Sequence, residues 1–251
     1  MKTIHSKKNL QVVQSQKAFV GFLPTAYPSA DDFLEIIKNA ETSGVDIFEF
    51  GYPPKDPFAD GEVIKSAYQA VDYDTAKDLK FWTKIRETIS APIWIMGYAQ
   101  DLVATGDYLN LAKAGVVDAF VIPDITLEES EALSKELGQH GVDIVCFAQN
   151  DADNIDAILE KNTLVYYQLV KGVTGSAHSN KMDFSALLEQ AESHENTFIF
   201  GGFGINNDEQ AKSVITQGFD GIIVGTEMVR QLNTGKQNLY KFIQSIKSAT
   251  T

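Results

Sequence analysis

Short apolar runs alternate with amphipathic stretches from one end of the chain to the other. Runs rich in β-branched and aromatic residues predict strands at Ala18–Leu23, Val45–Phe50, Pro92–Met96, Val117–Ile122, Val142–Phe147, Thr163–Val170, Thr197–Phe200 and Phe219–Val224. Helical periodicity occurs between them, at Ala30–Ser43, Asp78–Ile89, Asp101–Ala114, Leu127–His140, Asn154–Glu160, Phe184–Ser193, Asp208–Gln217 and Leu239–Ile246. Strands that alternate with helices indicate βαβ units and a parallel sheet.

The junctions from helix to strand repeat one short motif. A glycine, an apolar residue and an aspartate occur in turn at Gly44-Val45-Asp46, Gly141-Val142-Asp143 and Gly218-Phe219-Asp220, and with a second valine at Gly115-Val116-Val117-Asp118. A glycine at this place ends a helix in the left-handed conformation. The repetition indicates that the chain is built from αβ units of one architecture.

The number of units predicts how the sheet closes. The 251 residues divide into units of about 31 residues, enough for a strand, a helix and two short loops. We therefore predict an α/β fold, a (β/α)8 TIM barrel that forms a single domain over residues 1–251. An open doubly wound sheet is the alternative, but so little chain remains outside the eight strands that closure is favoured. The stretch Ser6–Gln16 predicts a short helix that closes the bottom of the barrel.

Composition and charge exclude several classes of partner. With 44% hydrophobic and 22% charged residues the chain is globular rather than disordered. Its net charge of −13 argues against a nucleic-acid partner, because affinity for a phosphate backbone needs a basic surface. No apolar run approaches the roughly 20 residues that span a membrane, and no apolar segment follows the N-terminal lysines as in a signal peptide. We expect a cytoplasmic protein.

The chain offers few residues for metal or covalent chemistry. Cys146 is the single cysteine and lies in an apolar run, so we expect a buried thiol and no internal disulfide. The histidines are scattered, with no pair four residues apart, at His5, His140, His178 and His194. No strand carries an obvious lysine for a Schiff base. The sequence therefore predicts neither a metal site nor a cofactor.

A carboxylate at the end of the second strand is the first candidate for chemistry, because barrels of this kind place their active sites at the C-terminal ends of the strands. Side chains alternate along a strand, so Glu49 points into the barrel if Val45 and Ile47 do. Burial raises the pKa of a carboxyl group and suits it to proton transfer near neutral pH. A glutamate paired with a lysine is the alternative. Asp60, in the next loop, is a second candidate, although it could simply cap the helix that starts near Glu62.

Glycine-rich loops follow the last three strands. Lys171–Ser176 is of the kind that closes over a ligand, and Gly201–Ile205 and Gly225–Glu227 follow strands seven and eight. Loops after those two strands, with a helix N-terminus, form the recurring phosphate site of such barrels. The pattern predicts a phosphorylated small molecule as ligand, with plain turn glycines as the alternative.

Taken together, these motifs resemble the tryptophan synthase alpha subunit family. The characteristic part is Glu49-Phe50-Gly51 followed by the loop end Asp56-Pro57-Phe58-Ala59-Asp60-Gly61. Further matches follow in the order and spacing of the family over nearly the whole chain: Phe19-Val20 with Phe22, Ile95-Met96-Gly97-Tyr98, Ile122-Pro123-Asp124, Gly172-Val173-Thr174-Gly175, Gly202-Phe203-Gly204-Ile205 and Val224-Gly225-Thr226.

The resemblance implies a lyase of tryptophan biosynthesis that cleaves indole-3-glycerol phosphate by a retro-aldol reaction to indole and glyceraldehyde 3-phosphate. It implies no cofactor, and a beta subunit as partner in an α2β2 complex. Glu49 would be the general acid and base, and Asp60 would hold the indole N–H and stabilise the positive charge that develops there. The remaining implied roles are an indole pocket of Phe22, Tyr98 and Tyr166, a phosphate site of Gly175, Phe203, Gly204, Gly225 and Thr226, and Thr174 on the closing loop beside Asp60.

The chain also departs from the usual pattern of the family. Tyr27 stands where the family has the aspartate of Gly-Asp-Pro, and Pro54 and Lys55 replace an aromatic residue and a serine or threonine. Gln100 replaces an asparagine, and Leu169-Val170-Lys171 replace small and basic residues. The alternatives are therefore a relative that acts alone or on another phosphorylated substrate, and a non-catalytic activator of a partner subunit.

Overall fold

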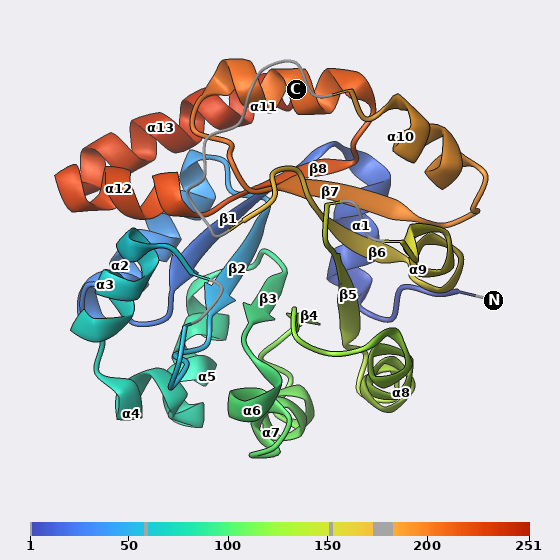
Figure 1. Ribbon diagram of the computed structural model, residues 1–251. Coiled ribbons are helices and arrows are strands. Elements are labelled where there is room, and N and C mark those ends of the chain that lie inside the picture. Colours follow the sequence, from blue (N-terminus) through green and yellow to red (C-terminus); the bar gives the residue numbers. More distant parts are fainter. Residues whose placement is uncertain (1, 58–59, 151–152, 173–182) are drawn as a thin grey trace.

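Eight parallel strands close into a barrel in chain order (Figure 1). The computed structural model describes residues 2–57, 60–150, 153–172 and 183–251. The strands are β1 (Ala18–Pro24), β2 (Ile47–Gly51), β3 (Ile93–Met96), β4 (Ala119–Val121), β5 (Asp143–Ala148), β6 (Leu164–Gln168), β7 (Phe198–Gly202) and β8 (Gly221–Val224). Pairing of Ala18 with Gly221 joins the first strand to the last. The predicted (β/α)8 barrel is confirmed, and the open sheet is excluded.

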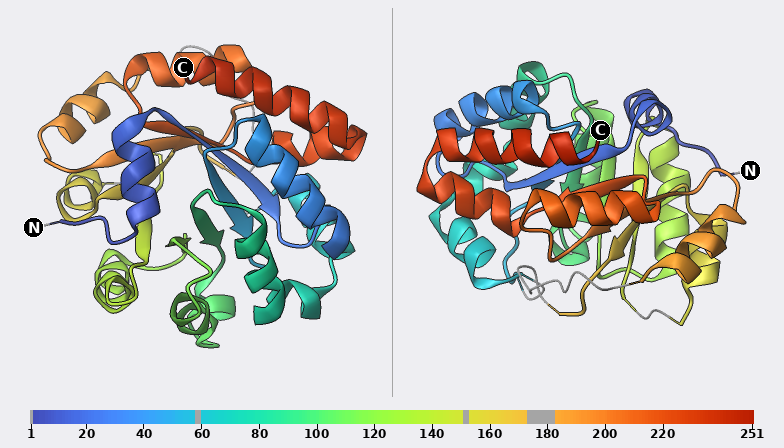
Figure 2. Two further views of the ribbon diagram at one scale, coloured as in Figure 1. Left: turned by 180° about the vertical axis from the view of Figure 1, so that it is seen from behind. Right: turned by 90° about the horizontal axis from the view of Figure 1, so that it is seen from above.

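Helices surround the barrel on the outside, except for the first, which lies across one end (Figures 1 and 2). They are α1 (Lys7–Ser15), α2 (Ala30–Ser43), α3 (Glu62–Ala70), α4 (Tyr73–Lys77), α5 (Leu79–Thr88), α6 (Ala99–Leu102), α7 (Asp107–Lys113), α8 (Leu127–Gly138), α9 (Ile155–Lys161), α10 (Ser185–Glu192), α11 (Asp208–Gln217), α12 (Thr226–Thr234) and α13 (Lys236–Ala249). Across the part of the chain that the structure describes, none of them is both long and apolar enough to cross a membrane.

One predicted helix is divided in the structure, and another, Leu239–Ile246, extends further at both ends as α13. The segment Asp101–Ala114 is divided into α6 and α7, because Gly106 has a positive φ of 78°, which an α-helix does not allow. By contrast, the motif glycines behave as predicted. Gly44, Gly115, Gly141 and Gly218 follow helices with φ values of 125°, 68°, 71° and 124°.

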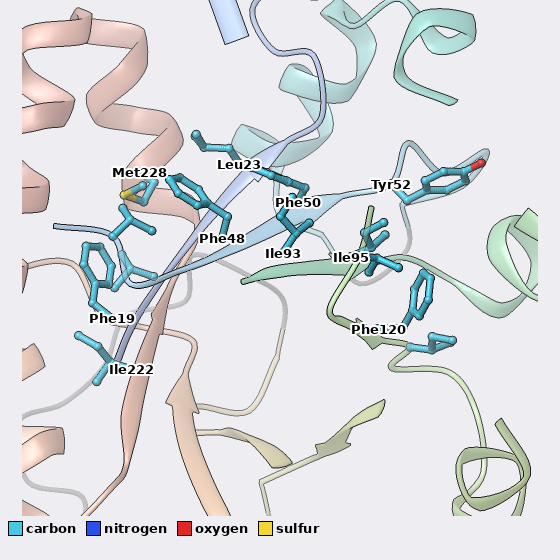
Figure 3. Close-up of a cluster of buried hydrophobic side chains, with 14 of the residues drawn as sticks. Phe19, Leu23, Phe48, Phe50, Tyr52, Ile93, Ile95, Phe120, Ile222 and Met228 are labelled. Carbon is cyan, nitrogen blue, oxygen red and sulfur yellow. The ribbon is translucent and has the colours of Figure 1, made fainter. Parts of the chain in front are cut away.

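Each strand separates two apolar layers. The inner cluster fills the barrel with residues such as Val20, Ile47 and Trp94. The outer cluster lies between the strands and the helices, and Phe48 and Phe50 extend into it from β2 (Figure 3). Alternation along β2 therefore places Ile47 and Glu49 inside, as predicted. The expectation for Val45 was wrong: it precedes the strand and packs in the outer cluster.

Helix α1 closes the N-terminal end of the barrel, as the sequence predicted. Asn9, which is fully buried, accepts a hydrogen bond from Trp94 Nε1 at 2.9 Å. Its amide nitrogen donates to Asp143 Oδ2 at 2.8 Å and to the carbonyl of Asp118 at 3.1 Å. These partners belong to β3, β5 and the residue before β4, so one side chain joins the helix to three strands. The opposite end of the barrel remains for the site.

We predict that Asn9→Ala lowers the free energy of unfolding by about 2–4 kcal/mol, because it leaves the buried Trp94 N–H without a partner and removes one hydrogen bond from the buried Asp143 carboxylate. Urea denaturation followed by tryptophan fluorescence measures this change. The matched control is Asn110→Ala, an exposed asparagine on α7, for which we expect a change within about 0.5 kcal/mol. Equal stabilities of the two variants would contradict the role given to Asn9.

Candidate active site

Glu49 lies inside the C-terminal end of the barrel. It is 2% exposed and stands beside Phe22 of β1 and Trp94 of β3 in the strand register. Its side chain lines a cavity of about 160 Å³. Within the described residues its Oε1 has no hydrogen-bond partner, and no lysine forms an ion pair with it. The expectation that Glu49 points into the barrel mouth is confirmed. The alternative, a glutamate paired with a lysine, is not observed among the described residues.

Asp60 lines the same cavity from the loop between β2 and α3 and is 1% exposed. Tyr98 donates a hydrogen bond from its phenol to Asp60 Oδ2 at 3.0 Å, whereas Oδ1 has no partner among the described residues. Helix α3 begins at Glu62, as predicted, but its N-cap is Gly61 and no side chain caps it. The alternative of Asp60 as a helix cap is therefore wrong, and its carboxylate faces the cavity instead.

Burial gives the two carboxyl groups different acidities. Burial raises the pKa of Asp60 to about 6, against the lowering effects of the Tyr98 hydrogen bond and of the Lys65 charge. Burial, followed by the negative charge of Asp60, raises the pKa of Glu49 to about 8. Asp60 loses its proton first, and its charge then makes ionisation of Glu49 harder. At neutral pH the arrangement holds one protonated and one ionised carboxyl group at the same cavity.

Aromatic side chains make the rest of the cavity wall. Phe22, Tyr98 and Tyr166 line it, as the sequence suggested. Sequence reasoning missed Phe147, whose ring centroid lies 5.2 Å from that of Tyr166 and 5.9 Å from that of Phe203. Alternation from the inward Val145 could have found it, and the same signal from Trp94 could have found Met96, which also lines the cavity.

Gly202 makes room for one of these rings. A Cβ atom at Gly202, the last residue of β7, would overlap with the ring of Tyr166. A side chain at this position would therefore push Tyr166 out of its place in the wall. The glycine that sequence analysis associated with a phosphate loop thus also shapes the aromatic pocket.

A second, smaller cavity of about 30 Å³ adjoins the first and shares Tyr166, Phe203 and Gly225 with it. Gly204 and Thr226 complete the set of predicted residues at this cavity. Gly225 is the N-cap of α12 and no side chain caps that helix, so the positive end of its dipole faces this region. The remaining predicted residues, Thr174 and Gly175, lie outside the residues that the structure describes, as does His178.

No other constellation in the described ranges competes with this one. Among those residues, no group of three metal-ligating side chains is present. His5 and His140 are exposed, and His194 contacts Asp156 at 3.0 Å on the surface. Cys146 is buried as expected, and burial raises the pKa of its thiol to about 11, so it is inert as a nucleophile.

Comparison with known proteins decides the family. The family model described as tryptophan synthase alpha chain matches residues 9–250. The tryptophan synthase alpha chain of Caldicellulosiruptor saccharolyticus is 32% identical over 254 residues, covering 99% of both chains. The chain belongs to the tryptophan synthase alpha chain family. The Arabidopsis thaliana tryptophan synthase alpha chain is 29% identical, with 94% of this chain and 91% of that protein covered. A chain of Mycobacterium tuberculosis tryptophan synthase, 24% identical, shares the fold with a TM-score of 0.83 over 98% of both chains.

Two departures from the usual pattern of tryptophan synthase alpha chains have structural partners here. The phenol of Tyr27 donates to Asn233 Oδ1 at 2.6 Å and so ties the loop after β1 to α12. The backbone N–H of Lys55 lies 3.3 Å from the carboxylate of Asp101, which holds the loop after β2 against α6. These contacts order loops that flank the cavity, while the Lys55 side chain stays exposed.

We predict that Asp60→Asn lowers the pKa of Glu49 below its value of about 8, since a negative charge beside it is removed. The pKa should stay above the ordinary value of 4.5, because burial is the larger cause. Carbon-13 NMR titration of carboxyl-labelled glutamate measures this shift. Asp56→Asn, which changes an exposed carboxylate of the same loop, is the control and should leave the Glu49 pKa as it is. An unchanged pKa in Asp60→Asn would show that the two groups are not coupled.

Proposed function

We propose that Glu49 and Asp60 carry out the reaction of the tryptophan synthase alpha chain, the retro-aldol cleavage of indole-3-glycerol phosphate to indole and glyceraldehyde 3-phosphate. The observation that carries the proposal is that both carboxyl groups line one aromatic cavity with pKa values raised to about 8 and about 6. Membership of the family supports the substrate, and the small cavity beside the first supports a phosphate group on it.

Glu49 acts twice in this proposal. Its protonated carboxyl group donates a proton to the indole ring carbon that bears the glycerol chain, which leaves a positively charged indolium. The Glu49 carboxylate then accepts the proton of the hydroxyl group on the adjacent chain carbon. The bond between ring and chain breaks, its electron pair restores the neutral indole, and the chain carbon becomes the aldehyde of glyceraldehyde 3-phosphate. The proton returns to Glu49, so a group with a pKa near the working pH suits both steps.

Asp60 stabilises the indolium. In this proposal its carboxylate accepts the indole N–H and faces the positive charge that develops on the ring after protonation. This is electrostatic stabilisation by a group that is in place before the reaction, in a cavity where apolar walls weaken screening by water. The pKa of about 6 keeps Asp60 ionised at neutral pH while Glu49 is still protonated.

In this proposal the aromatic walls bind the indole part of the substrate and the small cavity binds its phosphate group. Phe22, Tyr98 and Tyr166 would contact the indole ring, together with Phe147. The phosphate would lie in the small cavity at Phe203, Gly204, Gly225 and Thr226, where the N-terminus of α12 supplies backbone N–H groups. Thr174 and Gly175 stay assigned by family resemblance alone, to the closing loop and the phosphate site.

Glu49→Gln tests the proposed chemistry. The amide keeps the size of the side chain but can neither donate nor accept the proton, so we expect kcat for indole release to fall by at least about 100-fold. Indole formation from indole-3-glycerol phosphate is measured directly, with circular dichroism to verify folding. The matched control is Glu62→Gln, an exposed glutamate at the start of α3, which should keep its activity. Unchanged cleavage in Glu49→Gln would favour a non-catalytic role in a complex.

We also propose a tryptophan synthase beta subunit as the partner, in an α2β2 complex. We expect the purified chain to elute with the beta subunit of the same organism in size-exclusion chromatography. The exposed Lys55 side chain lies on the loop after β2, so Lys55→Glu should weaken co-elution. The control Lys38→Glu, on the exposed side of α2, should not. Separate elution of the two wild-type proteins would argue for a relative that acts alone.

A further inference from the structure

Tyr68 reaches the site from helix α3, which begins two residues after Asp60. Ile64 of this helix lines the large cavity, and Tyr68 lies one turn further along the same face. A Cβ atom at Gly51, the last residue of β2, would overlap with the Tyr68 phenol oxygen and would lie 2.9 Å from Phe22 Cζ. Gly51 lies two residues beyond Glu49 on the same strand. Only a glycine at this position therefore lets the Tyr68 phenol pack beside the ring of Phe22.

Three buried polar atoms without a hydrogen-bond partner in the described chain belong to this end of the barrel. They are Glu49 Oε1, Asp60 Oδ1 and the phenol oxygen of Tyr68. Buried polar atoms in native proteins are nearly always paired, so an unpaired donor near unpaired acceptors calls for a functional explanation. The phenol can donate, and an ionised carboxylate oxygen can only accept. The two kinds of atom are complementary.

The charges around Tyr68 keep it a donor. Burial, and after it the charges of Asp60, Tyr98 and Glu49, hold the pKa of the Tyr68 phenol well above its usual range. The phenol thus stays protonated wherever Asp60 is ionised. Lys65, on the same helix, is the cation that acts on Asp60, where it lowers the pKa. Tyr68 therefore offers a neutral O–H group beside the ionised form of Asp60.

We propose that Tyr68 is a positioning residue for Asp60, and that its phenol donates a hydrogen bond to Oδ1, directly or through one water molecule. Tyr98 donates to Oδ2, so the carboxylate is held between two phenols, which fixes its plane and favours its charged form. Each carboxylate oxygen accepts two hydrogen bonds, and Oδ1 keeps a lone pair for the indole N–H. The inference rests on the proposed function, in which Asp60 must be ionised and oriented when the indolium forms.

Tyr68→Phe tests this inference, because it removes the hydroxyl group and keeps the ring. We expect kcat for indole release to fall on the order of tenfold, with KM changed by less than about threefold, and the acidic limb of the pH profile of kcat/KM to move to higher pH. Carbon-13 NMR of carboxyl-labelled aspartate, with Asp60→Asn to identify the signal, should show a higher pKa for Asp60. Tyr98→Phe should raise the same pKa. Tyr240→Phe, which removes another buried phenol group on the outer helix α13, is the matched control and should change neither quantity.

The outcomes separate the two proposals. If the wild-type protein releases no indole from indole-3-glycerol phosphate, the proposed function fails. If the wild type is active and Tyr68→Phe matches it in kcat, or loses activity with an unchanged Asp60 pKa, the role of Tyr68 is overturned. A crystal structure of the wild type with indole and glycerol 3-phosphate gives a test that needs no variant. The Tyr68 oxygen should then lie within hydrogen-bond distance of Asp60 Oδ1 or of a water bound to it, and a phenol bonded to neither would exclude the inference.

Discussion

The site depends on the cost of placing two carboxyl groups side by side away from water. Glu49 and Asp60 are almost fully buried at the open end of the barrel. Two neighbouring negative charges are costly in such a place, so one group keeps its proton while the other loses it. Tyr98 and Lys65 favour the charged form of Asp60, and no comparable group acts on Glu49 within the described residues. The acid and the anion are thus distinguished by surroundings rather than by residue type.

The barrel makes this arrangement possible by separating stability from chemistry. Asn9, the aspartate just before β4 and the aspartate that begins β5 form a hydrogen-bonded network at the N-terminal end, where α1 closes the cylinder. The outer cluster packs the helices onto the strands without using any group that lines the cavity floor at Glu49. Buried polar atoms without a partner lower the stability of a fold. The packing and hydrogen bonds elsewhere in the barrel offset this cost, so the C-terminal end can keep such atoms.

Much of the fold and part of the site could be predicted from the sequence. Alternating apolar patterns and the glycine junctions determine the strands, and alternation alone places Glu49 inside. The break at Gly106 was missed because one glycine in a periodic stretch is often tolerated by a helix. The local sequence also left open whether Asp60 caps α3 or faces the cavity, since both need the same residue at the same place. Tyr68 could not be predicted from the sequence for a different reason. It lies close to Gly51 and Phe22, so the contact joins three elements of the fold, and no local sequence pattern encodes such a contact.

The raised pKa of Glu49 also accounts for a feature of the predicted phosphate site, which has no positively charged side chain in the described part of the chain. Neither cavity has a lysine or arginine among the described residues that line it. A positive charge close enough to neutralise a phosphate would also act on Glu49 and lower its pKa, because charges interact strongly across an apolar cavity. Glu49 would then be ionised at neutral pH and would lack the proton that the proposed reaction requires. Backbone N–H groups at Gly225 and the α12 terminus avoid this conflict, since their partial charges bind an anion but fall off over a short distance. An anion site built from glycine is therefore compatible with an acid of raised pKa at the same end of the barrel.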